Sequence, residues 1–179
     1  MNQDAIDAFW ADARIRARLN RISAIAGPNL DDTLPPPAWS FGATAEQADE
    51  SLDLVLCGVK TATASAFRDY QLENEELPQV GSLSIILDGA GFPRALIRTF
   101  DVQIVRFDKV GEEHAYAEGE GDRSLNHWRA VHEWFFKEYD AHTRGFSKDM
   151  RVVLERFELL VPTPTQVREH ARVDRSTPQ

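Results

Sequence analysis

Two apolar, β-branched runs separated by a short turn limit most strongly how this chain can fold. Residues 82–88 read SLSIILD, residues 93–107 read PRALIRTFDVQIVRF, and the turn between them contains DGAG. Such runs on either side of a glycine turn are typical of an antiparallel β-hairpin. The run RVVLERFELL at residues 151–160 predicts a final strand. We therefore expect a β-sheet that contains these three strands.

Patterns with helical periodicity precede and follow the hairpin. Apolar residues recur at near-helical spacing between residues 4 and 22. In TAEQADESLDLVLCG, Thr44 and the glutamine three residues later form a capping box, and Gly58 stands where a left-handed C-cap would end the helix. Another amphipathic helix is expected from Leu125. The combination predicts an α+β fold, with a small curved sheet or β-barrel braced by helices.

The length of 179 residues suits one main domain with a substantial core. Residues 1–40 are expected to form an N-terminal helix and an extended connector, because the three prolines of TLPPPAW exclude a helix. Residues 41–160 are expected to form the domain itself. Residues 161–179 are rich in proline and charge and are expected to be a loose tail.

The composition narrows the class of protein. The chain has no apolar run long enough to cross a membrane, no apolar signal core at its N-terminus and a single cysteine, Cys57, so we expect a cytoplasmic protein without a membrane partner. The net charge of −9 disfavours long polyanions such as DNA, because nucleic-acid binders usually carry a basic face. This charge favours a small ligand or a short single strand. No metal or cofactor motif is present, and the sequence gives no indication of the oligomeric state.

The segment CGVKTATAS, residues 57–65, is the first candidate site. Lys60 and Thr63 follow directly after the expected helix end. In the alternative interpretation, Lys60 is a solvated lysine beside a helix C-terminus, whose dipole favours a cation, and Thr63 is an ordinary strand residue. Side chains three positions apart on a regular strand face opposite sides. The two side chains would therefore converge only if the backbone turns after Gly58.

The segment AEGEGDRS, residues 117–124, is the second candidate site. Its glycines allow the backbone of Glu118 to approach another surface closely. Glu120 and Asp122 are neighbouring acids, so each of the three carboxylates is equally compatible with a solvated turn. Ser124 suits the N-cap of the following helix. Arg123 beside that helix end could help to bind an anion.

Taken together, GVKTATAS after a helix, LPQVGS before a strand, AEGEGDRSLNHW, and a helix ending in WFFKEY resemble the ASCH-domain family. The resemblance covers residues 41–160. It implies a PUA-like β-barrel and an association with RNA.

The resemblance also implies two kinds of activity. Small bacterial ASCH enzymes are amidohydrolases of acetylcytidine, and their Gly-x-Lys-x-x-Thr motif falls on Gly58, Lys60 and Thr63. Their glutamate, just after a His-Ala pair, falls on Glu118. By resemblance, Thr63 is the nucleophile, Lys60 its general base and Glu118 the proton donor. Other ASCH proteins are metal-dependent ribonucleases of single-stranded RNA or RNA-binding modules, so the expected partner is a small nucleoside or a short single-stranded RNA.

The sequence departs from the amidohydrolases at Ser65, where those enzymes have an arginine. Substrate contacts from that arginine cannot be transferred, although Arg68, Arg94, Arg98 or Arg123 could replace it. The expected substrate-binding residues are Gly58, Thr61, Ser65, Arg68, Arg123 and Ser124.

Overall fold

The computed structural model of the chain describes residues 2–19, 34–139 and 145–162. The predicted helical residues 20–22 and the tail from residue 163 lie outside the described residues. The described chain divides into two compact units. The first unit contains residues up to Gly58, residues 83–98 and the end of the last strand from Leu159, and the second contains residues 59–82 and 99–158.

Helices α1 (Gln3–Arg16) and α3 (Ala45–Leu56) belong to the first unit. The capping prediction for α3 is confirmed, because the Thr44 side chain accepts a hydrogen bond from the backbone N–H of Gln47. Gly58 follows the helix with a φ of +71°, a left-handed conformation that glycine adopts without steric cost. The buried face of α1 packs into an apolar cluster whose members are Ile6, Trp10, Ala13, Ile85, Leu87, Leu96 and Val161.

The sheet contains β1 (Ala38–Trp39), β2 (Ala62–Ala66), β3 (Leu83–Leu87), β4 (Pro93–Arg106) and β5 (Arg151–Val161). Its strand order is β1-β3-β4-β5-β2, and β4 and β5 each continue from one unit into the other. The hairpin prediction is confirmed, since β3 and β4 pair in antiparallel orientation. The α+β class is confirmed as well.

The sheet is open among the described residues, with β1 and β2 at its two edges. Of the two expected forms of the PUA-like fold, a small curved sheet or a β-barrel, the structure therefore has the open sheet. Strand β1 is only two residues long and pairs in parallel with β3. The prolines of residues 35–37 precede it directly, and proline has no backbone N–H to donate to a ladder. Strand β1 is therefore too short to provide a second long edge for closure.

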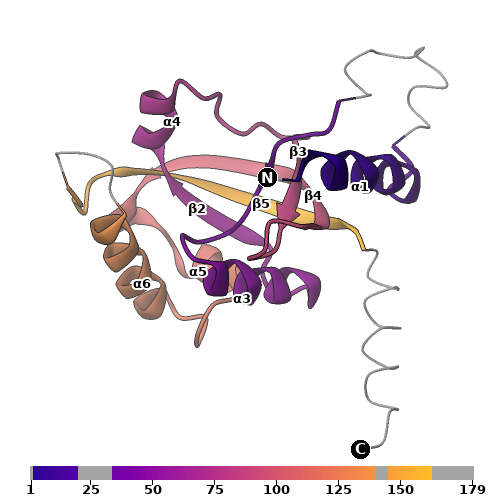
Figure 1. Ribbon diagram of the computed structural model, residues 1–179. Helices are drawn as coiled ribbons and strands as arrows, with labels where there is room; N and C mark the ends of the chain where they lie inside the picture. The colour runs from indigo at the N-terminus through magenta and orange to yellow at the C-terminus, as the bar shows by residue number, and fades with distance from the viewer. Residues whose placement is uncertain (1, 20–33, 140–144, 163–179) are drawn as a thin grey trace, which may run out of the picture. The chain divides into compact units, whose positions relative to one another are not determined.

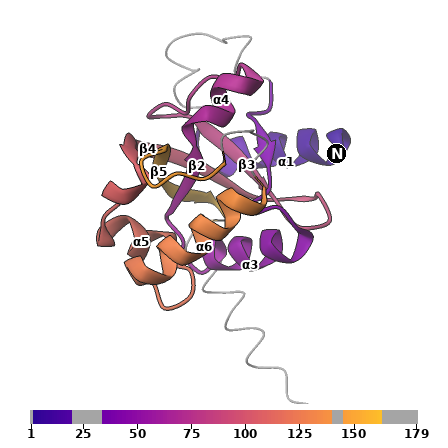
Figure 2. The same cartoon turned by 90° about the vertical axis from the view of Figure 1, so that its left-hand side faces the viewer.

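The second unit contains α4 (Phe67–Glu73), the short 3-10 helix η2 (Phe107–Lys109), α5 (Glu112–Glu118) and α6 (Leu125–Glu138). Helix α4 lies on one side of β2, while α5 and α6 lie on the other side (Figures 1 and 2). Helix α6 begins as predicted, because the Ser124 hydroxyl accepts a hydrogen bond from the N–H of His127 at 3.1 Å.

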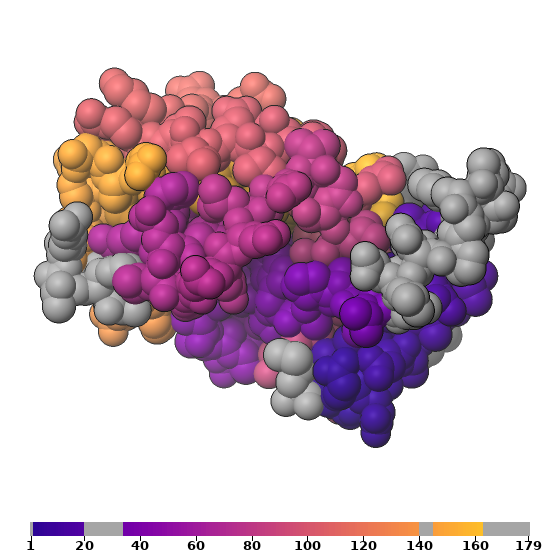
Figure 3. Space-filling model, turned by 90° about the horizontal axis from the view of Figure 1, so that it is seen from above, coloured from indigo at the N-terminus to yellow at the C-terminus, as the bar shows by residue number. Residues whose placement is uncertain are grey.

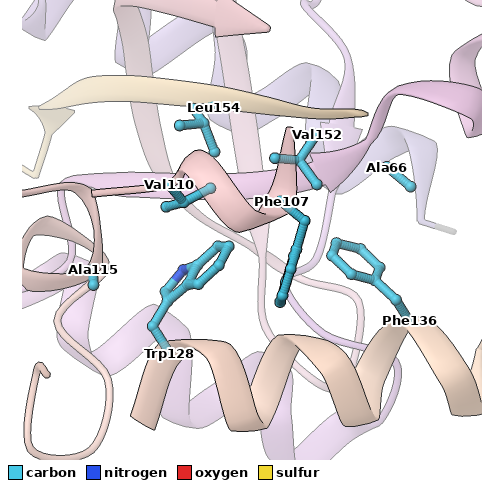
Figure 4. Packing of buried hydrophobic residues seen from close by; sticks show 8 residues of the cluster. All are labelled: Ala66, Phe107, Val110, Ala115, Trp128, Phe136, Val152 and Leu154. Carbon is cyan, nitrogen blue, oxygen red and sulfur yellow. The ribbon is translucent and has the colours of Figure 1, made fainter. Parts of the chain in front are cut away.

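The core of the second unit lies between α6 and the strands β2 and β5 (Figure 4). Trp128 and Phe136 of α6 pack around Phe107, with ring centroids 5.2 and 6.3 Å from the Phe107 ring. Ala66 contributes from β2, and Val152 and Leu154 contribute from β5. This packing fixes α6 and thereby the polar groups of Trp128 and His132, which line the candidate site.

Candidate functional site

A buried ion pair joins the two segments that the sequence singled out. The Nζ atom of Lys60 lies 3.2 Å from Oε2 of Glu118, and both side chains are only 2% exposed. The same Nζ atom lies 2.8 Å from Oε1 of Glu120, whose side chain is 30% exposed. Lys60 is therefore not the solvated lysine of the alternative interpretation. It connects the start of β2 to the end of α5 through two carboxylates.

Glu118 accepts hydrogen bonds from helices α5 and α6 as well. Its Oε1 atom accepts from the indole Nε1 of Trp128 at 2.7 Å and lies 3.0 Å from Nε2 of His114. Its Oε2 atom lies 3.5 Å from Nε2 of His132. We call Lys60, His114, Glu118, Trp128 and His132 the Glu118 network. The carboxylate of Glu118 is thus contacted by nitrogen atoms of all four other members of this network.

The backbone contact of His132 determines which ring nitrogen carries a hydrogen atom. Nδ1 of His132 lies 3.0 Å from the carbonyl oxygen of Trp128, which can only accept a hydrogen bond, so Nδ1 is the donor. Nε2 then interacts favourably with the carboxylate of Glu118 when it is protonated too. The His132 ring is also stacked on the indole of Trp128 at a centroid distance of 4.1 Å. These contacts orient the His132 ring so that Nε2 is directed at the carboxylate of Glu118.

The charges in the network shift both members of the ion pair toward their ionised forms. Burial acts to raise the pKa of Glu118, but the charges of His132 and Lys60 and the hydrogen bonds from both histidines outweigh burial and hold it well below its usual range. Burial likewise acts to lower the pKa of Lys60, but the charges of Glu118 and Glu120 outweigh it, and the pKa is raised. The resting pair is a carboxylate and an ammonium group.

The lowered pKa of Glu118 predicts an acid-dependent contribution to stability. A carboxyl group whose pKa is lower in the folded state stabilises the protein above its unfolded pKa, and this stabilisation is lost as the pH falls through the folded pKa. We therefore expect the free energy of unfolding of the wild type to fall more steeply below about pH 4.5 than that of Glu118→Gln. Urea denaturation of both proteins between neutral and acidic pH measures the difference. Equal slopes would contradict the proposed ionisation.

A close backbone approach holds the ion pair in position. Gly119 ends α5 with a φ of +78°, and a β-carbon at this residue would lie 2.8 Å from the carbonyl oxygen of Val59. Thr61, two residues after Val59, donates from both its N–H and its hydroxyl to the carbonyl oxygen of Ala117, at 2.7 and 3.3 Å. Glycine was expected to allow a close approach of the backbone beside Glu118, and at Gly119 the backbone does lie against that of Val59.

Gly119→Ala is expected to destabilise the protein more than Gly58→Ala. Both glycines have positive φ values, so each substitution introduces backbone strain of about 1–2 kcal/mol. Only at Gly119 would the new methyl group also overlap a neighbouring backbone, because nothing lies within 4 Å of the corresponding position at Gly58. Thermal denaturation of the two variants isolates the cost of the close approach. Equal melting temperatures would show that this contact is unimportant.

Thr63 faces away from the Glu118 network. Successive side chains of a strand alternate between its two faces, and Ala64 and Ala66 pack against the cluster that contains Trp128. Thr63 and Ser65 therefore face the opposite side of β2, where Tyr70 of α4 lies 2.9 Å from the Ser65 hydroxyl. Among the described residues, the Thr63 hydroxyl takes no part in the hydrogen bonds of the Glu118 network.

The remaining predicted site residues do not gather around Glu118. Arg68 of α4 donates to the carbonyl oxygen of Gly145 at 2.8 Å. Arg123 donates through Nε and Nη2 to the carbonyl oxygen of Tyr116, and its guanidinium group stacks 3.5 Å above the Tyr116 ring. Ser124 serves as the N-cap of α6, and Gly58 belongs to the first unit. The structure thus gives Arg123 a local partner, and its predicted anion-binding role stays a prediction.

Within the part of the chain that the structure describes, no group of three or more His, Cys, Asp and Glu side chains is arranged to hold a metal ion. None of the described helices is long and apolar enough to span a membrane. The place of Cys57 just after the apolar stripe of α3 predicts that it lies on or next to the buried helix face, but Cys57 is exposed. It follows the last helical residue and lies about half a turn from Val55 of the buried stripe.

Sequence reasoning missed several polar residues of the second unit. His114 and Trp128 were not recognised as partners of Glu118, although His114 precedes it by four residues and so shares its face of α5. His132 falls on the apolar stripe of the helix that begins at Leu125, which predicts a hydrogen-bonded core histidine, and this prediction is confirmed. Glu155 was also missed. The signal for Glu155 was an acidic residue directly after the apolar run Val152–Leu154 of the expected strand RVVLERF.

Comparisons with known proteins agree with this fold. A family model of the ASCH domain matches residues 37–161. The crystal structure of a protein from Enterococcus faecalis V583, assigned to the DUF984 family, is 31% identical, with a TM-score of 0.71, over 99% of this chain and 98% of that chain. An ASCH domain from Lactobacillus crispatus JV V101 is 30% identical, with a TM-score of 0.66, over 81% of this chain and 94% of that chain. The comparison with curated proteins gives no match.

Proposed function

Because the chain belongs to the ASCH-domain family, we propose that it is an amidohydrolase of a modified cytidine nucleoside, with acetylcytidine as the substrate to test. The observation that carries the proposal is the buried pair of Lys60 and Glu118. These are two of the three residues that the ASCH resemblance assigns to catalysis, and they are 58 positions apart in the sequence. Buried ionisable groups with shifted pKa values cluster at functional sites, so the assembly of this pair inside a small unit supports a functional role.

We assign the role of nucleophile to Thr63. A threonine hydroxyl attacks an acyl carbon only when a neighbouring base removes its proton. Lys60 would have to lose a proton to be that base, and its raised pKa opposes this loss. Glu118 would have to carry a proton to be the donor, and its lowered pKa opposes that state.

These directions favour a positioning role for the Lys60–Glu118 pair. The pair anchors the residues that lead into β2, together with the hydrogen bonds from Thr61 to Ala117. Thr63 follows this anchored segment directly, at the second position of β2. An anchor of this kind would hold the nucleophile in a fixed orientation, which is a large part of the advantage of an enzyme over free solution.

The charge of the chain supports a small neutral substrate. A net charge of −9 repels a long polyanion, whereas a nucleoside carries no phosphate group. The net charge therefore favours a nucleoside over a long RNA, although the PUA-like fold is often linked to RNA.

The direct experiment is to incubate the purified protein with acetylcytidine and to follow cytidine and acetate by chromatography. A parallel reaction contains a short single-stranded RNA with a divalent metal ion. Release of acetate from the nucleoside, with the RNA left intact, supports the proposal. Cleavage of the RNA without acetate release would favour the ribonuclease instead, and RNA binding without either reaction would favour a binding module.

A further inference from the structure

A second carboxyl group lies on the face of β2 that carries Thr63. In the antiparallel pairing of β2 with β5, Thr63 is directly opposite Glu155. Directly opposed residues point to the same face of a sheet, with β-carbons about 4.5–5.5 Å apart. The side chains of Glu155 and Thr63 are therefore neighbours on one face of the sheet.

Three further polar residues surround this pair. The hydroxyl of Thr99 on β4 donates to Oε2 of Glu155 at 3.1 Å. The hydroxyls of Ser65 and Tyr70 lie 2.9 Å apart. We call these five residues the Thr63 face; its members are Thr63, Ser65, Tyr70, Thr99 and Glu155. All five belong to the second unit.

The Thr63 face is partly open to solvent. Thr63, Ser65, Tyr70 and Glu155 are half-buried, and only Thr99 is fully buried. Helix α4, which carries Tyr70, lies on this side of β2 (Figures 1 and 2) and forms part of the surface seen from above in Figure 3. A substrate could thus reach Glu155, whereas Glu118 is enclosed.

The protonation of the Thr63 face differs from that of the Glu118 network. Burial raises the pKa of Glu155, and the hydrogen bond from Thr99 only partly opposes this shift. Burial also raises the pKa of Tyr70, and the negative charges of Glu155, Glu75 and Asp69 raise it further. A glutamate whose pKa is raised accepts and returns a proton more readily than a glutamate whose pKa is lowered.

We infer that Glu155 is the acid–base catalyst that serves Thr63, and that the Thr63 face binds the acylated amine of the substrate. This inference rests on the proposed function, because it assigns the proton transfers of that same hydrolysis. It replaces Lys60 and Glu118 as the groups that move protons and leaves them as positioning residues.

Glu155 returns every proton that it accepts within one reaction cycle. The carboxylate of Glu155 takes the proton of the Thr63 hydroxyl while Oγ1 attacks the acyl carbon, and the protonated Glu155 then gives this proton to the leaving amine as the carbon–nitrogen bond breaks. Water attacks the resulting threonine ester, its proton passes to Glu155, and the proton returns to Oγ1 as the ester bond breaks. The sum is one amide and one water converted to one carboxylic acid and one amine.

The Thr63 face also defines the class of ligand. Hydroxyl groups at Ser65 and Tyr70 and a carboxyl group at Glu155 provide both donors and acceptors without a fixed positive charge. Such a set suits the neutral, mixed donor–acceptor edge of an acylated aminopyrimidine. It does not suit a phosphate group, which a carboxylate would repel.

The test is to measure acetylcytidine hydrolysis by Glu155→Gln. The amide can still accept the hydrogen bond from Thr99, so the variant should fold, which its melting temperature verifies. We expect turnover to fall by about a hundredfold or more, the usual contribution of a general acid–base group, with the affinity for substrate largely retained. Glu76→Gln removes the same charge from an exposed residue of the second unit and should leave turnover unchanged.

A second measurement keeps the inference testable if the wild type does not hydrolyse acetylcytidine. Nuclear magnetic resonance then follows Thr63, Ser65 and the side-chain carboxyl of Glu155 as acetylcytidine is added. Shifts at these positions without hydrolysis would support the binding face and overturn the proposed function. Hydrolysis with normal turnover in Glu155→Gln would overturn the inference and leave the function intact. Neither hydrolysis nor shifts at these positions would overturn both.

Discussion

Replacement of Lys60 by methionine is expected to lower the free energy of unfolding by about 3 kcal/mol, because it removes the ammonium group that pairs with the buried carboxylate of Glu118. Methionine has a similar length and would fill the same space. The cost therefore comes from the unpaired charge more than from a cavity. Urea denaturation at neutral pH measures the effect.

A matched control is Lys137→Met on α6. Lys137 also pairs with a glutamate, Glu133, at 2.6 Å, but its side chain is 56% exposed. An exposed pair of this kind contributes at most about 1 kcal/mol. The double variant Lys60→Met/Glu118→Gln should recover part of the loss, since it removes both charges together. If Lys60→Met is no less stable than Lys137→Met, the Lys60–Glu118 ion pair does not anchor the segment that leads into β2.

Thr63→Val is expected to reduce acetylcytidine hydrolysis by at least about a thousandfold, since valine preserves the shape of threonine but has no nucleophilic oxygen. The half-buried position and the β-branched replacement should leave stability nearly unchanged. Initial rates of acetate release measure the loss.

Thr63→Ser provides the control for this variant. It retains the hydroxyl group and should therefore retain a readily measurable rate. Equal rates for the valine and serine variants, both close to wild type, would remove Thr63 from the reaction. If both variants fold but are equally and almost completely inactive, the methyl group of Thr63 is essential, which contradicts a role through its hydroxyl alone.

Local rules were sufficient for the regular elements of this chain. Thr44 and Gly58 mark the two ends of α3, and Ser124 marks the start of α6, because capping depends on residues within one or two turns. The hairpin of β3 and β4 follows from two β-branched runs and a glycine turn. Helix α4 was not predicted, since it is seven residues long and has neither a side-chain cap nor a buried residue.

The candidate site is formed by contacts between residues far apart in the sequence, and local sequence rules do not predict such contacts. Lys60 and Glu118 were identified by resemblance, but their ion pair became visible only in the fold. Trp128 fits a helical apolar stripe, and nothing in that stripe shows that its indole N–H binds a carboxylate. Glu155 becomes relevant only through the register that places it opposite Thr63. A one-residue change of that register would turn Glu155 to the other face of the sheet.

The most direct test of the account is mass spectrometry of the wild type, quenched during turnover of acetylcytidine. Cleavage after Lys60 and Arg68 releases residues 61–68, which contain Thr63. The account predicts that this peptide gains the mass of one acetyl group, located on Thr63, and that the same peptide from Thr63→Val gains none. Rapid hydrolysis without any acetylated Thr63, and with full activity in Thr63→Val, would contradict it.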